Sequence, residues 1–241
     1  GGKNYFKTPI HPIVSHRNNR GRDVAYEHTE FTSGKEICKA ASDASISLYA
    51  PSEGTFFHFA DYRTDEVNKL KGEPSAKKIA IVHSESYRTS FSYSALSHTY
   101  AMQMYNSSKK ATENTVDELT GEQIAYKNII LQYSSWRKYD ENGYLNIDVD
   151  EPNVGKYIVN GKAIDITWKK HTPWGATFYY DTNGNQITMD TGKTWVCIIQ
   201  DTYSDRVEIL GSDDNSDTSA DTQGSEEQAA AEEAAASDTE Y

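Results

Sequence analysis

The chain has 241 residues, of which 37% are apolar and 12% aromatic, enough to build the core of one large domain or two small ones. Its formal net charge is -12, but ten of the acidic residues lie between 212 and 241, a stretch without Lys or Arg. Leaving out those ten charges changes the net charge from -12 to -2, which excludes a strong basic field for nucleic acid and a strong acidic field for a basic partner.

The two cysteines and the hydropathy restrict the class of protein further. Cys38 and Cys197 lie far apart and outside any Cys-x-x-Cys spacing, so we expect two buried thiols rather than a disulfide, a metal site or a redox dithiol. An apolar run of about 18 residues is lacking, so we predict no transmembrane segment in this chain. We expect the opening GGKNYFKTPIH to be a truncated start, so the missing signal segment there is uninformative about the parent protein.

Two short helices are predicted in the first 75 residues. SGKEICKAASDAS begins with Ser33 three residues before Glu36, which is the spacing of a capping box. TDEVNKLKGEP has Thr64 as a candidate N-cap and the stop residues Gly72 and Pro74. We therefore predict a small mixed region over 1–75.

From residue 76 the hydrophobic period changes from that of a helix to that of a strand. The predicted strands cover 77–84, 88–96, 98–106, 128–133, 143–150, 155–159, 162–170, 176–181, 185–189 and 193–200. Asn160-Gly161 and Asn183-Gly184 each lie between two of these strands, where the pair favours a two-residue type I′ turn. The alternation places Trp168 on an inward face.

These elements predict an α+β protein with three parts. The mixed region 1–75 is followed by an antiparallel β-rich meander over 76–210. Residues 211–241 combine acidic residues with Ser, Thr, Ala, Gly and Gln, a composition that buries too little apolar surface to fold, so we predict a disordered acidic tail.

Neither a metal ion nor a cofactor is predicted. A calcium loop that starts at Asp181 would need Gly in place of Gln186 and an acid in place of Gly192. Gly192-Lys193-Thr194 resembles the end of a phosphate loop, but the first Gly is missing and a strand follows where a helix is needed. The serines around His83 and His98 favour a solvated sheet face over a Ser-His site.

The candidate binding residues lie in three places. Ser15, His16 and Arg17 belong to the basic segment HPIVSHRNNRGR, where an Arg can bind a carboxylate or phosphate by forked hydrogen bonds or can simply pair with an acid of this chain. The connection HTPWG carries His171 and Trp174 at a loop tip, where exposed aromatic rings can contact a sugar or peptide. The third candidate is His58.

Residues 76–200 resemble the C-terminal region of the YerB-type lipoproteins of Gram-positive bacteria, a family of unknown function. Four motifs carry the resemblance in the same order: GEQIAYKNIILQY, GKYIVNGKAIDITWKK, TFYYDTNGNQITM and GKTWVCII. HPIVSHR is similar to the family segment Gly-Pro-Val-Arg-Ser-x-Arg, with Ser15 and Arg17 matching, whereas His11 and Val14 differ.

The resemblance implies a bacterial, extracytoplasmic, membrane-associated protein whose parent is tethered by a lipidated N-terminal Cys, a residue that this chain lacks. It also implies that the region 1–75 is only part of the family's N-terminal region. It transfers no catalytic residue. Our leading hypothesis is a non-catalytic binding or scaffolding module of the cell envelope that recognises a peptide, a glycan or a membrane protein through aromatic and Arg residues. The alternative is an envelope hydrolase or transferase with Arg17 and His16 or His58 in a cleft between the N-terminal and the C-terminal part.

Overall fold

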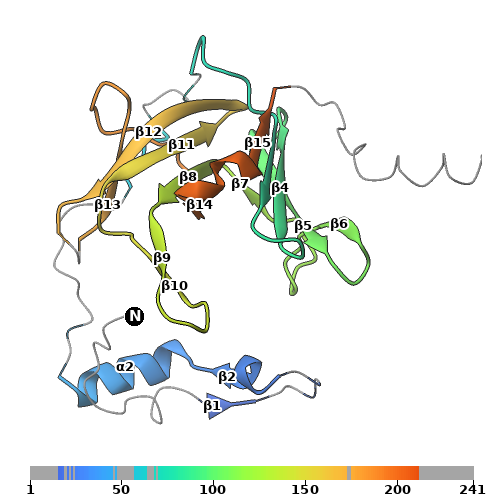
Figure 1. Cartoon of the computed structure of the whole chain (residues 1–241), viewed down its shortest axis with the longest axis vertical. Helices are drawn as coiled ribbons and strands as arrows, with labels where there is room; N and C mark the ends of the chain where they lie inside the picture. The colour runs from blue at the N-terminus through green and yellow to red at the C-terminus, as the bar shows by residue number, and fades with distance from the viewer. Residues whose placement is uncertain are drawn as a thin grey trace, which may run out of the picture.

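The computed structural model describes residues 16–18, 21, 23, 25–45, 47, 57–63, 68, 70–172 and 175–211. Within these residues the protein consists mainly of β-sheet, mostly antiparallel, with few helices (Figure 1). The predicted acidic tail over 212–241 and most of the predicted helix over 64–71 lie outside the described residues.

The N-terminal part is a short hairpin followed by one helix. Strand β1 (His16–Arg17) pairs antiparallel with β2 (Glu30–Phe31), and the 3-10 helix η1 (Tyr26–Thr29) precedes β2. Helix α2 (Gly34–Asp43) begins after Ser33, whose Oγ accepts a hydrogen bond from the Glu36 amide at 3.3 Å and donates one to the Glu36 carboxylate at 2.7 Å. The predicted N-cap is thus confirmed.

A five-stranded sheet forms the centre of the molecule. Its strand order is β13-β12-β11-β8-β14. The bounds are β13 (Thr177–Tyr180), β12 (Lys162–Lys170), β11 (Asn153–Val159), β8 (Asn128–Ser134) and β14 (Thr194–Gln200). The first four strands form the predicted antiparallel meander, but β14 pairs with β8 in parallel. The prediction of a purely antiparallel meander was wrong, because β14 does not pair with the preceding strand β13. It lies at the opposite edge of the sheet, beside β8.

A second, antiparallel sheet has the order β15-β3-β4-β5-β6, and β7 pairs with the other end of β5. The bounds are β15 (Val207–Leu210), β3 (Lys78–Val82), β4 (Arg88–Ser94), β5 (Thr99–Asn106), β6 (Ala111–Asn114) and β7 (Ala125–Tyr126). The short 3-10 helix η2 (Asp201–Arg206) connects β14 to β15, so the chain passes from one sheet to the other at this point. A separate hairpin joins β9 (Trp136–Lys138) to β10 (Leu145–Ile147).

Strand β8, an interior strand of the five-stranded sheet, is buried on both faces. One face shares a core with the second sheet, in which Ile129 and Leu131 of β8 pack with Ile79 and Phe91. On the other face Ile130 and Trp168 belong to a second cluster. The segment around Phe57 and the stretch up to Met189 cover this second face, since Ala60 donates a backbone hydrogen bond to Met189 at 2.8 Å. Trp168 is fully buried, as its position in the alternation predicted.

The two Asn-Gly pairs form different turns. At Asn160-Gly161 both residues have positive φ, 50° and 76°, and Val159 pairs with Lys162, so the two-residue type I′ turn is confirmed. In the second loop Gly184 has a positive φ of 83°, but Asn183 does not. There Asp181 accepts backbone hydrogen bonds from Asn183 and Asn185 through its carboxylate, so the loop is longer and the type I′ prediction was wrong.

Two further expectations need correction. The predicted strand over 185–189 forms only isolated bridges, from Gln186 to Tyr180 and from Met189 to Phe59, because this stretch lies along the second core rather than beside a full strand. Both cysteines are free, as expected, but only Cys197 is buried whereas Cys38 is exposed on α2. Burial raises the pKa of the Cys197 thiol to about 11.

Candidate functional site

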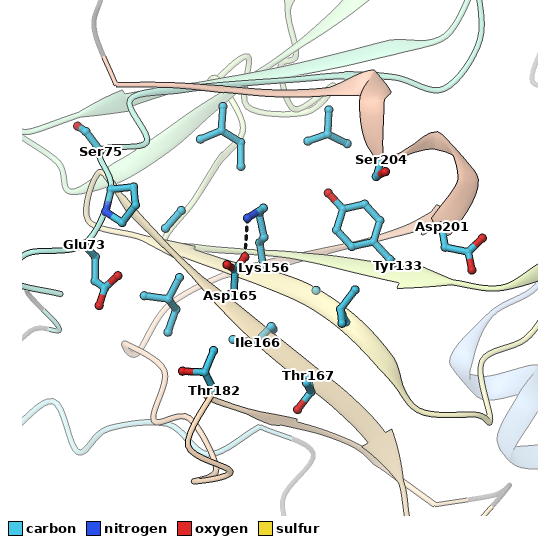
Figure 2. A pocket seen from close by; sticks show the side chains of 17 residues that line it. Glu73, Ser75, Tyr133, Lys156, Asp165, Ile166, Thr167, Thr182, Asp201 and Ser204 are labelled. Carbon is cyan, nitrogen blue, oxygen red and sulfur yellow. Dashed lines mark hydrogen bonds and ion pairs between the residues drawn. The ribbon is translucent and has the colours of Figure 1, made fainter.

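The candidate site is a pocket of about 810 Å³ at a corner where the two sheets diverge (Figure 2). Strands β11 and β12 form its floor, while η2 and β15 form the opposite wall. Ligand pockets of proteins typically measure roughly 300–1,000 Å³ and combine apolar walls with a few polar groups. This pocket has both properties, since Val154, Ala163, Val207 and Ile209 line it together with charged and hydroxyl side chains.

An ion pair lies on the floor of the pocket. Lys156 of β11 and Asp165 of β12 are directly opposite each other in the strand register, and the Lys156 Nζ donates to an Asp165 carboxylate oxygen at 2.5 Å. The Asp165 side chain is 69% exposed, against 35% for Lys156. The pair therefore presents a carboxylate to anything that enters the pocket (Figure 2).

Tyr133 contributes a hydroxyl group from the end of β8. Its side chain belongs to the core between the sheets and the residue is only 7% exposed, yet the hydroxyl points into the pocket (Figure 2). Among the described residues the hydroxyl has no hydrogen-bond partner and is not among the buried polar atoms, so it is accessible from the pocket. Burial, and then the nearby charge of Asp165, raise the pKa of Tyr133, so the hydroxyl stays protonated at neutral pH.

The wall opposite the ion pair depends on β15 being held in place. Leu210 accepts a backbone hydrogen bond from Lys77 at 2.6 Å, and Ser75 Oγ donates to the Gly211 carbonyl at 3.2 Å. Asp201 and Ser204 of η2 add a carboxylate and a hydroxyl to the same side of the pocket. The site is thus assembled from four strands and one 3-10 helix.

A buried polar network at the Asn160-Gly161 turn accounts for several residues of the predicted motifs. The Asp190 carboxylate accepts hydrogen bonds from Asn160 Nδ2 at 2.7 Å and from the Asn68 amide at 2.9 Å, and lies 3.4 Å from Lys127 Nζ. Tyr157 donates to Asn128 Oδ1 at 2.8 Å and accepts from the Asp190 amide at 3.2 Å. Since the polar groups of this network satisfy one another, it anchors the Asn160-Gly161 turn and leaves no free group for a ligand.

His16 and Arg17 lie in the N-terminal hairpin, away from the pocket-lining residues. The Arg17 guanidinium donates to the Tyr26 carbonyl at 2.7 Å and to the Glu30 carboxylate at 3.1 Å, and it stacks over the Tyr26 ring at 3.7 Å. His16 Nδ1 lies 3.1 Å from a Glu36 carboxylate oxygen. These contacts hold the hairpin together. Of the two uses of Arg17 that the sequence left open, the structure shows the pairing with an acid of the same chain.

The other predicted site residues are scattered. His58 is exposed and contacts Thr188 through Nδ1 at 3.2 Å, and His171 lies 3.5 Å from the Tyr180 hydroxyl. Ser15 and Trp174 lie outside the described residues. The structure does not bring His58 and His171 together with Arg17 into one site within the described part of the chain, and their role in binding stays a prediction.

Sequence reasoning missed the residues that line the pocket, although one signal was available. Lys156 and Asp165 each lie three residues from the Val159–Lys162 pair that flanks the Asn160-Gly161 turn, so the turn alone predicts that they face each other. Tyr133 and Ser204 could not be found in this way, because their positions depend on how the two sheets pack.

Some kinds of site are not found among the described residues. Within these ranges no group of three or more His, Cys, Asp or Glu side chains is arranged to hold a metal ion. In the same part of the chain no helix is long and apolar enough to span a membrane.

Comparisons with known proteins support the fold and a family. Residues 78–196 match the family described as "Protein of unknown function (DUF3048) C-terminal domain". The crystal structure of YerB protein from Bacillus subtilis is similar with a TM-score of 0.60 and 20% sequence identity over 82% of this chain. The match spans only 59% of the YerB chain. No curated protein matches. Residues 78–196 therefore resemble a domain family of unknown function, and the fold of the chain is similar to that of YerB.

Proposed function

We propose that this protein is a ligand-binding module whose binding site is the pocket between the two sheets. The observation that carries the proposal is the Tyr133 side chain, which is buried except at its hydroxyl; the hydroxyl has no hydrogen-bond partner among the described residues and points into an 810 Å³ pocket beside the Lys156–Asp165 pair (Figure 2). A hydroxyl that is open to the pocket and unused by the protein can bond to a ligand that displaces solvent from it. The apolar wall from Val207 and Ile209 would hold the body of that ligand.

The proposal is for binding without catalysis. Lys156 is engaged by Asp165 across the sheet, so its ammonium group is occupied by an ion pair rather than positioned as a nucleophile. His16 and His58, on which the hydrolase alternative depends, do not line this pocket and contact Glu36 and Thr188 instead. The pocket thus supports recognition of a peptide, a glycan or a small molecule better than it supports hydrolysis.

We also propose that the protein works outside the cytoplasmic membrane of a Gram-positive bacterium, tethered through a lipidated Cys of the parent protein. The support is the resemblance of four ordered motifs to YerB-type lipoproteins. The test is to express the full-length parent protein in a Gram-positive host and add protease to intact cells. Degradation of the protein while a cytoplasmic marker survives is the expected result, and survival of both would contradict the location.

The binding site can be tested with an uncharged, environment-sensitive dye of the Nile red type. Val154 is 55% exposed on the floor of the pocket, and Val154→Trp should fill part of the pocket and lower dye affinity at least about tenfold, because a bulky ring takes the space of the ligand. Val116, which is 51% exposed and not part of the lining, provides the matched control Val116→Trp. Dye binding that is unchanged in Val154→Trp, or equally weakened in both variants, would refute the assignment.

A further inference from the structure

The charged side chains that line the pocket give it a negative balance. Of the seventeen residues of the lining, Lys156 carries a positive charge, while Glu73, Asp165 and Asp201 carry negative charges. Three carboxylates and one ammonium leave a net charge of about -2 at neutral pH. The pocket therefore combines an apolar wall, which includes Val207 and Ile209, with an excess of negatively charged hydrogen-bond acceptors.

One carboxylate oxygen in the pocket is available. The bond from Lys156 uses Oδ1 of Asp165, and the hydrogen bonds among the described residues leave Oδ2 without a partner. The side chain is 69% exposed to the pocket and its solvent. An ionised carboxylate accepts several hydrogen bonds at once, so Asp165 can bind a second cationic donor without releasing Lys156.

The Tyr133 hydroxyl provides a second acceptor in the same space. A protonated phenol donates one hydrogen bond and also accepts through its oxygen lone pairs. Burial is the main reason that the pKa of Tyr133 is raised, and the negative charge of Asp165 is the second. The same negative potential at the hydroxyl favours a positively charged ligand group there.

From these observations we infer that the pocket binds ligands with an apolar body and a primary ammonium head, the head bonding to Asp165 and Tyr133 and the body lying against Val207 and Ile209. This inference rests on the proposed function, because it names the ligand class of the same pocket. An alkylammonium group occurs both in free amines and in the lysine side chains of peptides. The shared chemistry is a chain of methylene groups that ends in a cation.

The test is to measure by titration calorimetry the affinity of the full chain for octylamine, octanol and octanoate, which share one apolar body. We expect octylamine to bind at least about tenfold more tightly than octanol, since a charge-assisted hydrogen bond is stronger than a hydrogen bond between neutral groups. Octanoate should bind more weakly than octanol. To separate the two sources, acetyl-Ala-Lys-Ala-amide is compared with the same peptide carrying norleucine in place of Lys.

Two variants connect the preference to the named groups. Asp165→Asn should lower octylamine affinity about tenfold or more and raise that of octanoate, because Lys156 then remains without its partner. Tyr133→Phe keeps the ring and should lower octylamine affinity severalfold while octanol affinity changes little. The matched control is Asp43→Asn, since Asp43 forms the equivalent exposed pair with Lys39 on α2 but does not line the pocket.

The outcomes separate this inference from the proposed function. Equal affinity for octylamine, octanol and octanoate, with binding lost in Val154→Trp, would overturn the ammonium preference and leave the pocket as the binding site. An octylamine preference that persists in Asp165→Asn would also overturn the inference. If none of the three compounds, the two peptides or the dye binds, both proposals fail. A lysine peptide that binds while octylamine does not would identify peptides as the source of the ammonium group.

Discussion

At the scale of single residues, we expect the buried ion pair of Asp190 and Lys127 to have a large effect on stability. Their side chains are only 5% and 12% exposed. Asp190→Ala would leave the buried Lys127 ammonium without a carboxylate, with only Asn160 Oδ1 to accept from it, and would remove the acceptor for Asn160 Nδ2. We expect the free energy of unfolding, measured by urea denaturation at pH 7, to fall by about 3–5 kcal/mol.

The control for this prediction is a solvent-exposed ion pair of the same protein. Asp43 and Lys39 are about half exposed or more, so Asp43→Ala should change the free energy of unfolding by less than about 1 kcal/mol. Similar losses in the two variants would mean that burial does not decide the strength of these pairs.

His83 makes stability depend on pH. Burial lowers the pKa of His83 below its ordinary value of 6.5, and its Nε2 is buried without a hydrogen-bond partner. The unfolded chain therefore takes up the proton more readily, so this contribution to stability is complete above pH 6.5 and is lost as pH falls through the lowered pKa.

The measurement is urea denaturation of the wild type and His83→Phe at pH 7 and pH 5. We expect the wild type to lose more stability than the variant over this interval, because only the wild type carries the histidine. His83 remains partly exposed and stacks on Tyr87 at 4.6 Å, so the difference should be modest. A larger loss in the variant would reverse the assigned sign.

At the scale of elements, the contact between β11 and β8 depends on Gly155. A Cβ at this position would lie 2.5 Å from the Leu131 carbonyl oxygen, closer than atoms can approach. Gly155→Ala should therefore force the strands apart and lower the free energy of unfolding by about 1–3 kcal/mol. Chemical denaturation measures the effect.

A second glycine tests whether this loss is specific. At Gly34, at the start of α2, an added Cβ meets nothing within 4 Å, so Gly34→Ala should be neutral or slightly stabilising. A loss at Gly34 as large as that at Gly155 would argue against close packing as the cause.

At the scale of the whole molecule, β15 links the two sheets and forms a wall of the pocket. A chain that ends at Arg206 lacks the pairing of Val207–Leu210 with β3. We expect it to lose dye binding and to melt at a lower temperature. A chain that ends at Gly211 keeps every described contact of β15 and should melt and bind as the full chain does.

The comparison of the two truncations also tests the predicted acidic tail. Removing 212–241 takes the formal net charge from -12 to -2 without removing any of the described contacts. If the chain that ends at Gly211 were much less stable, the tail would contribute to the fold and the prediction of a disordered tail would be wrong.

The sequence alone predicted the features that depend on residues close together in the chain, such as helix starts and tight turns. Ser33 and Glu36 predicted the start of α2, because a capping hydrogen bond spans only three residues. Asn160-Gly161 predicted a turn and with it the register of β11 and β12, because both residues tolerate positive φ. The alternation along β12 also predicted the burial of Trp168. The second Asn-Gly pair failed, since the Asp181 carboxylate organises a longer loop.

Only the tertiary structure decided the pairing of β14 with β8 and the position of the pocket. Alternation shows which side of a strand is apolar but carries no information on which distant strand lies beside it, so the parallel pair was not predictable. Tyr133 lies beside the Lys156–Asp165 pair because β8 neighbours β11, and the pocket stays open because η2 carries the chain to the second sheet at that corner. Short-range backbone preferences thus determined the turns and strands, whereas long-range packing of two sheets placed the candidate site.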